Sequence, residues 1–153
     1  MVQAACSRPG SLIPSAVSGD LRGALMEEVD DSVVVFSFED GWRIVELLTK
    51  FDYQREGGLM GNCVGMFYDG PHTIYSLRNS LNEPRANILL VGREVTEVAG
   101  RYNTAPKPKY TKRVKRFLAE RGYTVAPTAF LITELRSRNL ERRQNETRRY
   151  GAG

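Results

Sequence analysis

The order of apolar and polar residues predicts a β-hairpin in the first third of the chain. β-branched and aromatic residues are concentrated in residues 32–38 and return in residues 42–47. The Asp40-Gly41 pair between them is typical of a tight hairpin turn, since glycine accepts the backbone conformation that such turns require.

Three more strands follow in the middle of the chain. Residues 72–78 and 86–91 are rich in apolar and β-branched side chains, whereas residues 94–99 alternate polar and apolar positions as a half-buried strand does. Short polar or glycine-containing turns separate the three segments. This order predicts an antiparallel meander.

Helical signals surround the meander. Thr49 or Asp52 can cap a helix that ends near Gly57-Gly58 or at Gly61. A second helix is expected from Lys109 to about Arg121. It carries its apolar residues at helical spacing on one side and ends at a glycine. These residues are Tyr110, Val114, Phe117 and Leu118, followed by Gly122.

The ends of the chain differ from its centre. Residues 1–19 are rich in Ser, Ala, Gly and Pro and are expected to form a flexible leader. Residues 20–142 are interpreted as a single domain, which includes a short helix at 21–29 and a last helix at roughly 128–142. Residues 143–153 are expected to be a frayed basic tail. Helices beside an antiparallel sheet predict an α+β fold.

Composition excludes several classes of protein. The chain has 153 residues, no apolar run long enough to span a membrane, and no basic start followed by an apolar run that would indicate a signal peptide. Two cysteines do not make a disulfide framework and suggest a reducing compartment. With a single histidine, a structural zinc site is not expected, and no metal or cofactor is predicted.

Charge is distributed unevenly along the chain. Residues 1–100 hold 8 Lys and Arg against 14 Asp and Glu, a net charge of −6. Residues 101–153 hold 14 Lys and Arg against 4 Glu, a net charge of +10. Such asymmetry favours a basic C-terminal surface that binds nucleic acid or another polyanion, although a solvated surface also explains many runs of charge.

The basic residues concentrate on one loop and on the helix that follows it. Pro106 and Pro108 keep this loop extended, and the cations of the helix lie outside its apolar stripe. The candidate nucleic-acid-binding residues are Arg101, Lys107, Lys109, Lys112, Arg113, Lys115 and Arg116. No known nucleic-acid-binding motif accompanies them, so binding without sequence specificity is expected.

A cysteine between two glycines is the most unusual local feature. Gly61 and Gly65 flank Cys63 between a predicted helix and a predicted strand, where a thiolate can be stabilised. Cys63, with His72 and Tyr75, is therefore a candidate catalytic group, provided that these residues meet in space. The alternative is that Cys63 packs as a small apolar residue and His72 lies in a turn.

Other polar residues could contact a ligand. Ser76 and Arg78 share one face of their predicted strand and could hold a phosphate or a carboxylate together, unless that face is simply solvated. Asn103 can recognise a base or an amide, or it can bond to its own backbone in a turn.

An ordered series of short motifs resembles one known family. The series begins with Glu39-Asp-Gly-Trp-Arg-Ile-Val-Glu46, Glu56-Gly-Gly-Leu-Met60 and Met60-Gly-Asn-Cys-Val-Gly65, and it continues with Ile74-Tyr-Ser-Leu-Arg78 and Asn82-Glu-Pro84. Val98-Ala-Gly-Arg-Tyr-Asn103, Ala105-Pro106 and a basic helix that ends in Phe117-Leu118 complete it. Over residues 32–121 the chain resembles the PcfJ-like proteins of phages, conjugative plasmids and other mobile elements.

The resemblance implies a bacterial cytoplasm and a mobile-element origin but supplies no reaction. It points to Gly100 and to the ligand candidates named above, and it adds Asn62, which stands where the family commonly has histidine before the cysteine. A mechanism that needs that imidazole is not expected here.

Three functional hypotheses follow from these observations. The first is an accessory protein that associates with nucleic acid through its basic C-terminal surface. The second is a small enzyme that acts on a nucleotide or nucleic acid at a site centred on Cys63. The third is a host-interaction or counter-defence inhibitor whose partner is a host protein. No membrane partner is expected, because the basic helix uses its apolar face in the core.

Overall fold

The computed structural model describes residues 30–151 of the chain. The predicted leader at 1–19 and the predicted helix at 21–29 lie outside the described residues.

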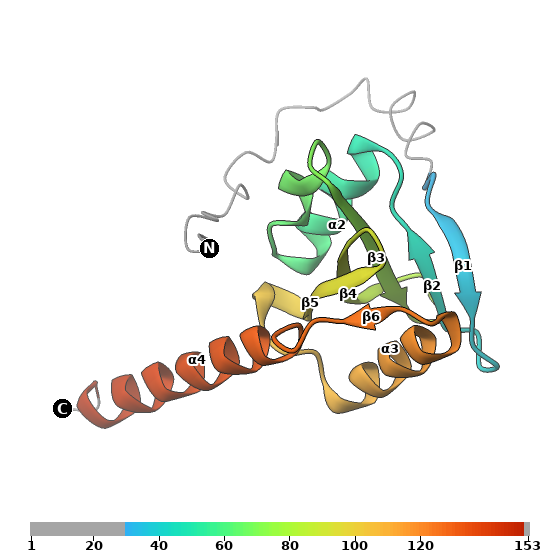
Figure 1. Cartoon of the computed structure of the whole chain (residues 1–153). Coiled ribbons are helices and arrows are strands. Elements are labelled where there is room, and N and C mark those ends of the chain that lie inside the picture. The colour runs from blue at the N-terminus through green and yellow to red at the C-terminus, as the bar shows by residue number, and fades with distance from the viewer. Residues whose placement is uncertain (1–29, 152–153) are drawn as a thin grey trace, which may run out of the picture.

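One six-stranded sheet forms the centre of the described chain (Figure 1). Neighbouring strands run antiparallel from the first to the fifth, and the sixth pairs in parallel with the fifth. The strands lie in chain order: β1 Val33–Ser37, β2 Arg43–Glu46, β3 His72–Arg78, β4 Pro84–Val91, β5 Glu94–Ala99 and β6 Thr124–Val125. With the helices on the sheet, this arrangement confirms the α+β fold.

The predicted hairpin and the predicted meander belong to a single sheet. β2 pairs with β3 in a register that places Ile44 opposite Leu77, which joins the two predicted units edge to edge. β6 was not predicted, because two residues are too few to show a period of alternation. A helix connects β5 to β6, as a parallel pair requires.

Two α-helices follow the predicted signals closely. α2 (Lys50–Met60) begins after Thr49, whose hydroxyl accepts from the Asp52 N–H while the Asp52 carboxylate accepts from the Thr49 N–H. α2 ends at Gly61, which adopts a left-handed conformation with φ of 62°. α3 (Pro108–Arg121) begins with a proline and ends at Gly122, also left-handed.

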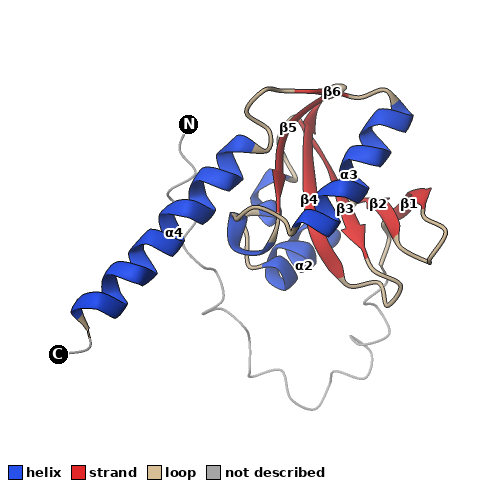
Figure 2. Ribbon diagram, turned by 90° about the horizontal axis from the view of Figure 1, so that it is seen from below, coloured by secondary structure: helices blue, strands red, loops and turns tan. Residues whose placement is uncertain are grey.

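The larger core lies between α3 and one face of the sheet (Figure 2). The predicted stripe of α3 is buried there, with Val114 and Phe117 almost fully excluded from solvent. The facing side chains come from alternate positions of the central strands, among them Tyr75, Leu77 and Ile88. The burial of these residues confirms the apolar stripe that their spacing predicts.

A smaller core covers the opposite face of the sheet, beneath α2 and the 3₁₀ helix η2 (Val64–Phe67). Ile74 and Leu89 point to this side, together with Tyr53 of α2. Ser76 and Arg78 follow Ile74 at alternate positions of β3, so they also lie beneath α2 and not in solvent. The sheet thus has a helix layer on each face.

The last helix is longer than the sequence analysis predicted. α4 spans Leu131–Tyr150, so the expected frayed tail after Arg142 is helical almost to the end of the described chain. No glycine or proline interrupts it, and it is rich in Leu, Arg and Glu, which have high helix propensity.

α4 projects away from the rest of the described chain (Figure 1). Only its first turns contact the sheet, where the Thr133 hydroxyl donates to the Val98 carbonyl at 2.9 Å. Every residue from Arg138 to Tyr150 is exposed. Among the helices within residues 30–151, none is both long enough and apolar enough to cross a membrane.

Candidate anion-binding site

A buried polar network fills the space between α2 and the sheet. Arg78 and Asn87 lie on neighbouring strands and reach the two oxygens of the Glu56 carboxylate, at 3.2 Å and 2.6 Å. Asn87 accepts from the side-chain amide of Asn62 at 2.7 Å, and Asn62 in turn accepts from the Val64 N–H at 3.1 Å. The network thereby fixes the loop that follows α2.

The second carboxylate at Arg78 belongs to Asp30, at the edge of the same network. Asn82 and Arg78 both donate to Asp30. Burial alone would raise the pKa of Asp30, but the hydrogen bonds from Ser32 and Asn82 and the charge of Arg78 lower it well below its usual value. Asp30 is therefore ionised at neutral pH.

Glu56 shows the opposite shift. Its carboxylate is almost fully buried, and this desolvation raises its pKa despite the Ser76 hydroxyl, the Arg78 charge and the Asn87 amide, all of which favour the ionised form. Two carboxylates therefore flank one guanidinium at its buried and its partly exposed sides. Such a network positions the backbone, and it leaves Arg78 without charge to offer a ligand.

The three candidate catalytic residues each have other contacts. Cys63 is buried, and the Asn103 side-chain amide lies 3.7 Å from its sulfur. The His72 ring packs edge-on against Phe67, at 4.7 Å between ring centroids. The Tyr75 hydroxyl lies 2.9 Å from that of Tyr123, on the α3 side of the sheet.

These contacts do not assemble a nucleophile and its base. No cysteine in the described part of the chain has a free thiol. Burial, followed by the hydrogen bond to Tyr123, raises the pKa of Tyr75, so its phenol stays protonated. The catalytic role of Cys63, His72 and Tyr75 stays a prediction, and the contacts described above do not join these residues to one another.

The four candidate ligand residues separate into two places. Asn62, Ser76 and Arg78 come together beneath α2, where they are buried. Asn103 lies in the 3₁₀ turn η3 (Arg101–Asn103), and its carbonyl accepts from Arg136 of α4 at 3.3 Å. Asn103 and Cys63 bring the two loops that carry the family-like motifs side by side.

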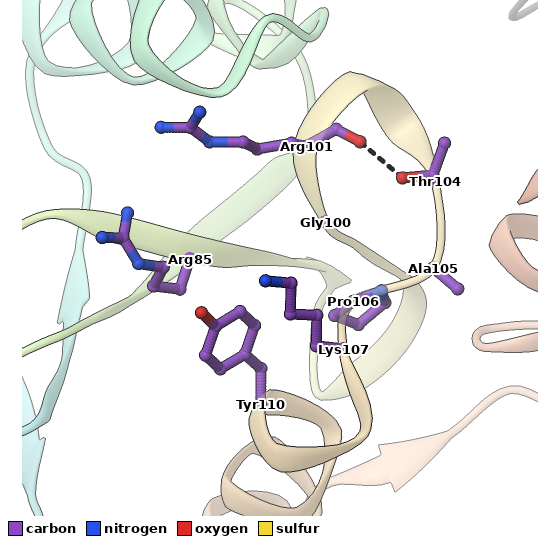
Figure 3. Close-up of a pocket in the computed structure, with 8 residues that line it drawn as sticks. All are labelled: Arg85, Gly100, Arg101, Thr104, Ala105, Pro106, Lys107 and Tyr110. Carbon is purple, nitrogen blue, oxygen red and sulfur yellow. Dashed lines mark hydrogen bonds between the residues drawn. The ribbon is translucent and has the colours of Figure 1, made fainter.

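An open basic cavity lies on the other side of η3, between β4 and the start of α3 (Figure 3). The cavity has a volume of about 360 Å³. The polar ends of Arg85, Lys107 and Tyr110 point into the same opening, and Arg101 lies across from them. The remaining lining comes from Gly100, Thr104, Ala105 and Pro106.

The loop at this cavity has a defined shape. A Cβ on Gly100 would lie 2.9 Å from the Cα of Pro106, so only glycine permits the loop to fold back here. Thr104 donates to the Arg101 carbonyl at 2.6 Å, and the Ala105 N–H donates to Ser137 of α4 at 2.8 Å. These contacts hold Arg101 and Lys107 on opposite sides of the opening.

A second cavity, of about 370 Å³, adjoins the first and shares Arg85 and Arg101 with it. It adds Arg55 of α2 to the basic residues. Glu83 lines it as well and forms an ion pair with Arg85. Positive charge therefore predominates along both cavities, with one carboxylate at their border.

The candidate cations of α3 differ in whether carboxylates neutralise them. Arg113 pairs with Asp40, and Arg116 pairs with Glu39 and with Glu120. Asp40 and Glu39 belong to the hairpin turn, so the acidic front half compensates these two arginines. Among the ion pairs within residues 30–151, none includes Arg101, Lys107, Lys109, Lys112 or Lys115.

These ion pairs set the pKa values of the turn carboxylates. The hydrogen bonds from Arg116 lower the pKa of Glu39 to about 2, and those from Arg113 lower the pKa of Asp40 to about 2. Arg113 also lies over the Trp42 ring, 4.3 Å from its centroid. Arg113 and Arg116 thus join α3 to the hairpin.

No cluster of three metal-ligating His, Cys, Asp or Glu residues occurs within residues 30–151. Neither a protein-family model, nor a curated protein, nor a solved structure matches the chain. The PcfJ-like resemblance therefore stays a prediction that rests on its motifs.

Sequence reasoning missed several residues of the two sites. Glu56 and Asn87 complete the buried network, while Arg55, Arg85 and Tyr110 complete the basic cavities. Asn87 carried a signal, because it is a polar residue within an otherwise apolar strand. Arg85 carried none, since a single arginine on a strand is ordinary.

Proposed function

We propose that this protein associates with nucleic acid through cations that no carboxylate of the described chain compensates. These cations are Arg101, Lys107, Lys109, Lys112 and Lys115, named here the open basic surface. All five are exposed and come from a single stretch of chain that begins at η3 and runs along α3. Their concentration on one stretch of chain, without an ion pair to a carboxylate, is the observation that carries the proposal.

The chemistry of the open basic surface suits a phosphate backbone. Lysines that extend from a helix can each neutralise a phosphate, and the released counterions then favour binding. Lys109, Lys112 and Lys115 form no ion pair among the described residues. Two of them lie over aromatic rings instead: Lys115 is 5.0 Å from the centroid of Phe130, and Lys109 is 5.2 Å from that of Tyr110. These ring contacts hold the Lys109 ammonium group against α3 and that of Lys115 against the residue that precedes α4.

The projecting part of α4 supplies further arginines. Residues 138–150 contain five arginines and two glutamates, and all of them are exposed. Arginines on an exposed helix can contact phosphate oxygens, and such contacts carry no sequence information. On this proposal α4 extends the contact, and the surface binds without sequence specificity. As the family resemblance implies, the protein would act in the bacterial cytoplasm as an accessory protein of a mobile element.

The experiment compares two double variants that carry equal net charge. Lys112→Gln/Lys115→Gln removes two cations from the open basic surface, while Arg43→Gln/Lys50→Gln removes two cations from β2 and α2. Fluorescence anisotropy with a labelled 20-base-pair DNA and the corresponding RNA gives the affinity of each. The first variant is expected to bind about 30-fold more weakly than the second, since each of its two lost phosphate contacts costs on the order of 1 kcal/mol.

Two results would overturn the proposal. Wild-type protein that binds neither DNA nor RNA at low salt would remove nucleic acid as the partner. Equal weakening in the two double variants would show that net charge acts without regard to position. Circular dichroism of both variants confirms that each remains folded before affinities are compared.

A further inference from the structure

We infer that the cavity formed by Arg85, Arg101, Lys107 and Tyr110 binds a terminal phosphate monoester, such as the 5′ phosphate of a nucleic acid strand. This inference rests on the proposed function and adds a ligand chemistry to it. The cavity is larger than a phosphate group needs and is open on one side, so the rest of a strand can leave it.

The charge of the cavity suits a phosphate dianion. Arg85, Arg101 and Lys107 contribute three positive charges, and the ion pair of Glu83 with Arg85 offsets one of them. A terminal phosphate monoester carries between one and a half and two negative charges near pH 7, on the order of one more than a phosphodiester. The balance therefore favours a strand end over an internal phosphate.

Tyr110 gives a second and independent indication of a ligand. Its side chain is more than nine-tenths buried, packed against Trp42 at 5.5 Å between ring centroids. Its hydroxyl nevertheless has no hydrogen-bond partner among residues 30–151 and points into the cavity (Figure 3). The ring is buried while the hydroxyl faces the open cavity, so a phosphate oxygen held there can accept a hydrogen bond from it.

The N-terminus of α3 adds a favourable dipole at the same place. Lys107 is the residue that precedes the first turn of α3, and it lines the cavity. No side chain caps this terminus, and the first turn contains no acidic residue. The partial positive charge of the 14-residue helix is thus left for an anion.

The experiment uses two single-stranded oligonucleotides that differ only in a 5′ phosphate or a 5′ hydroxyl. Anisotropy competition at constant ionic strength gives the affinity for each strand. Inorganic phosphate is the third probe, and its binding is detected through the NMR shifts of the backbone amides between residues 100 and 110. Wild-type protein is expected to bind the phosphorylated strand about tenfold more tightly than the hydroxyl strand. This ratio corresponds to about 1.4 kcal/mol, roughly the net contribution of one hydrogen bond to a charged group.

Matched variants locate the preference. Tyr110→Phe removes one hydroxyl without an internal partner, so it should keep the thermal stability and lose most of the preference. Tyr150→Phe, on the exposed end of α4, is the control and should change neither. Lys107→Gln should also abolish the preference, while Lys50→Gln, which removes the same charge from the start of α2, should retain it.

The outcomes separate this inference from the proposed function. Equal binding of the two strands, with unchanged amide shifts in phosphate, would overturn the phosphate site and leave nucleic-acid association in place. If phosphate changes the amide shifts of the wild-type protein but not those of Tyr110→Phe, and no strand binds, the phosphate site would be supported and the nucleic-acid association contradicted. A preference that survives both Tyr110→Phe and Lys107→Gln would place the phosphate elsewhere and contradict the inference.

Discussion

Arg78 and Arg101 are the same residue type in opposite surroundings. Arg78 is almost fully buried between the carboxylates of Asp30 and Glu56, and its charge serves the fold. Arg101 is exposed at a cavity and forms no ion pair within the described residues. The number of basic residues on a surface therefore does not determine how much positive charge is available to bind an anionic partner. The position of the acidic residues decides it.

Breaking the buried ion pair of Arg78 with Glu56 should change the free energy of unfolding more than any other proposed substitution. Arg78→Met leaves the buried carboxylate of Glu56 without a counter-charge, so the free energy of unfolding should fall by about 3–5 kcal/mol. Urea denaturation followed by circular dichroism measures this change. Arg101→Met serves as the control and should change the same quantity by less than about 0.5 kcal/mol, because its side chain is exposed.

A second substitution keeps this test decisive if Arg78→Met does not fold. In Glu56→Gln/Arg78→Met the uncompensated buried charge is removed, so the double variant should be more stable than the single one. A single variant as stable as the wild type would mean that the buried pair contributes nothing, and the contrast with Arg101 would be lost.

Removing the exposed part of α4 should affect binding and leave the fold intact. A chain that stops after Ser137 keeps the contacts of Thr133 and Arg136 with β5, and the described residues that it loses, 138–151, are all exposed. Its free energy of unfolding should lie within about 1 kcal/mol of the full chain, while its affinity for DNA decreases. Cooperative unfolding at much lower urea would show that residues beyond 137 stabilise the core.

The smallest expected effect on stability comes from the carboxylates of the hairpin turn, and carbon-detected NMR titration can measure their pKa values. The ion pair with Arg116 lowers the pKa of Glu39 to about 2 in the folded chain, below its value in the unfolded chain. Its stabilising contribution is therefore present above the ordinary glutamate pKa and is lost as the pH falls toward 2. Arg116→Gln should return the pKa of Glu39 to its ordinary value. A wild-type pKa already at that value would mean that the pair does not form in solution.

The strands and the apolar stripe of α3 were predictable because they follow local periods. Tyr110, Val114 and Phe117 are spaced as one helix face, and all three are buried. The alternation along β3 also predicted that Ser76 and Arg78 share one face, and both lie beside Glu56 of α2, whereas Tyr75 lies in the core on the α3 side. Such patterns need only the geometry of the element itself.

The candidate site was less predictable because its parts meet through tertiary contacts. Asp40 lies 73 positions before Arg113 in the chain, and no local pattern marks the two as partners. The same holds for Glu56, which reaches Arg78 and Asn87 on different strands. The sequence placed the basic residues on the correct elements, but only the fold distinguishes those that face carboxylates from those that do not.

The most direct test of the account is the salt dependence of DNA binding for two sets of α3 variants. Lys112→Gln/Lys115→Gln removes two cations that form no ion pair within the described residues. Glu39→Gln/Asp40→Asn/Arg113→Gln/Arg116→Gln removes two carboxylates and two cations, and with them three ion pairs, without changing the net charge. The slope of log K against log salt should become shallower by about two in the first and stay unchanged in the second. An unchanged slope in the lysine variant, or a comparable loss in the ion-pair variant, would contradict the account.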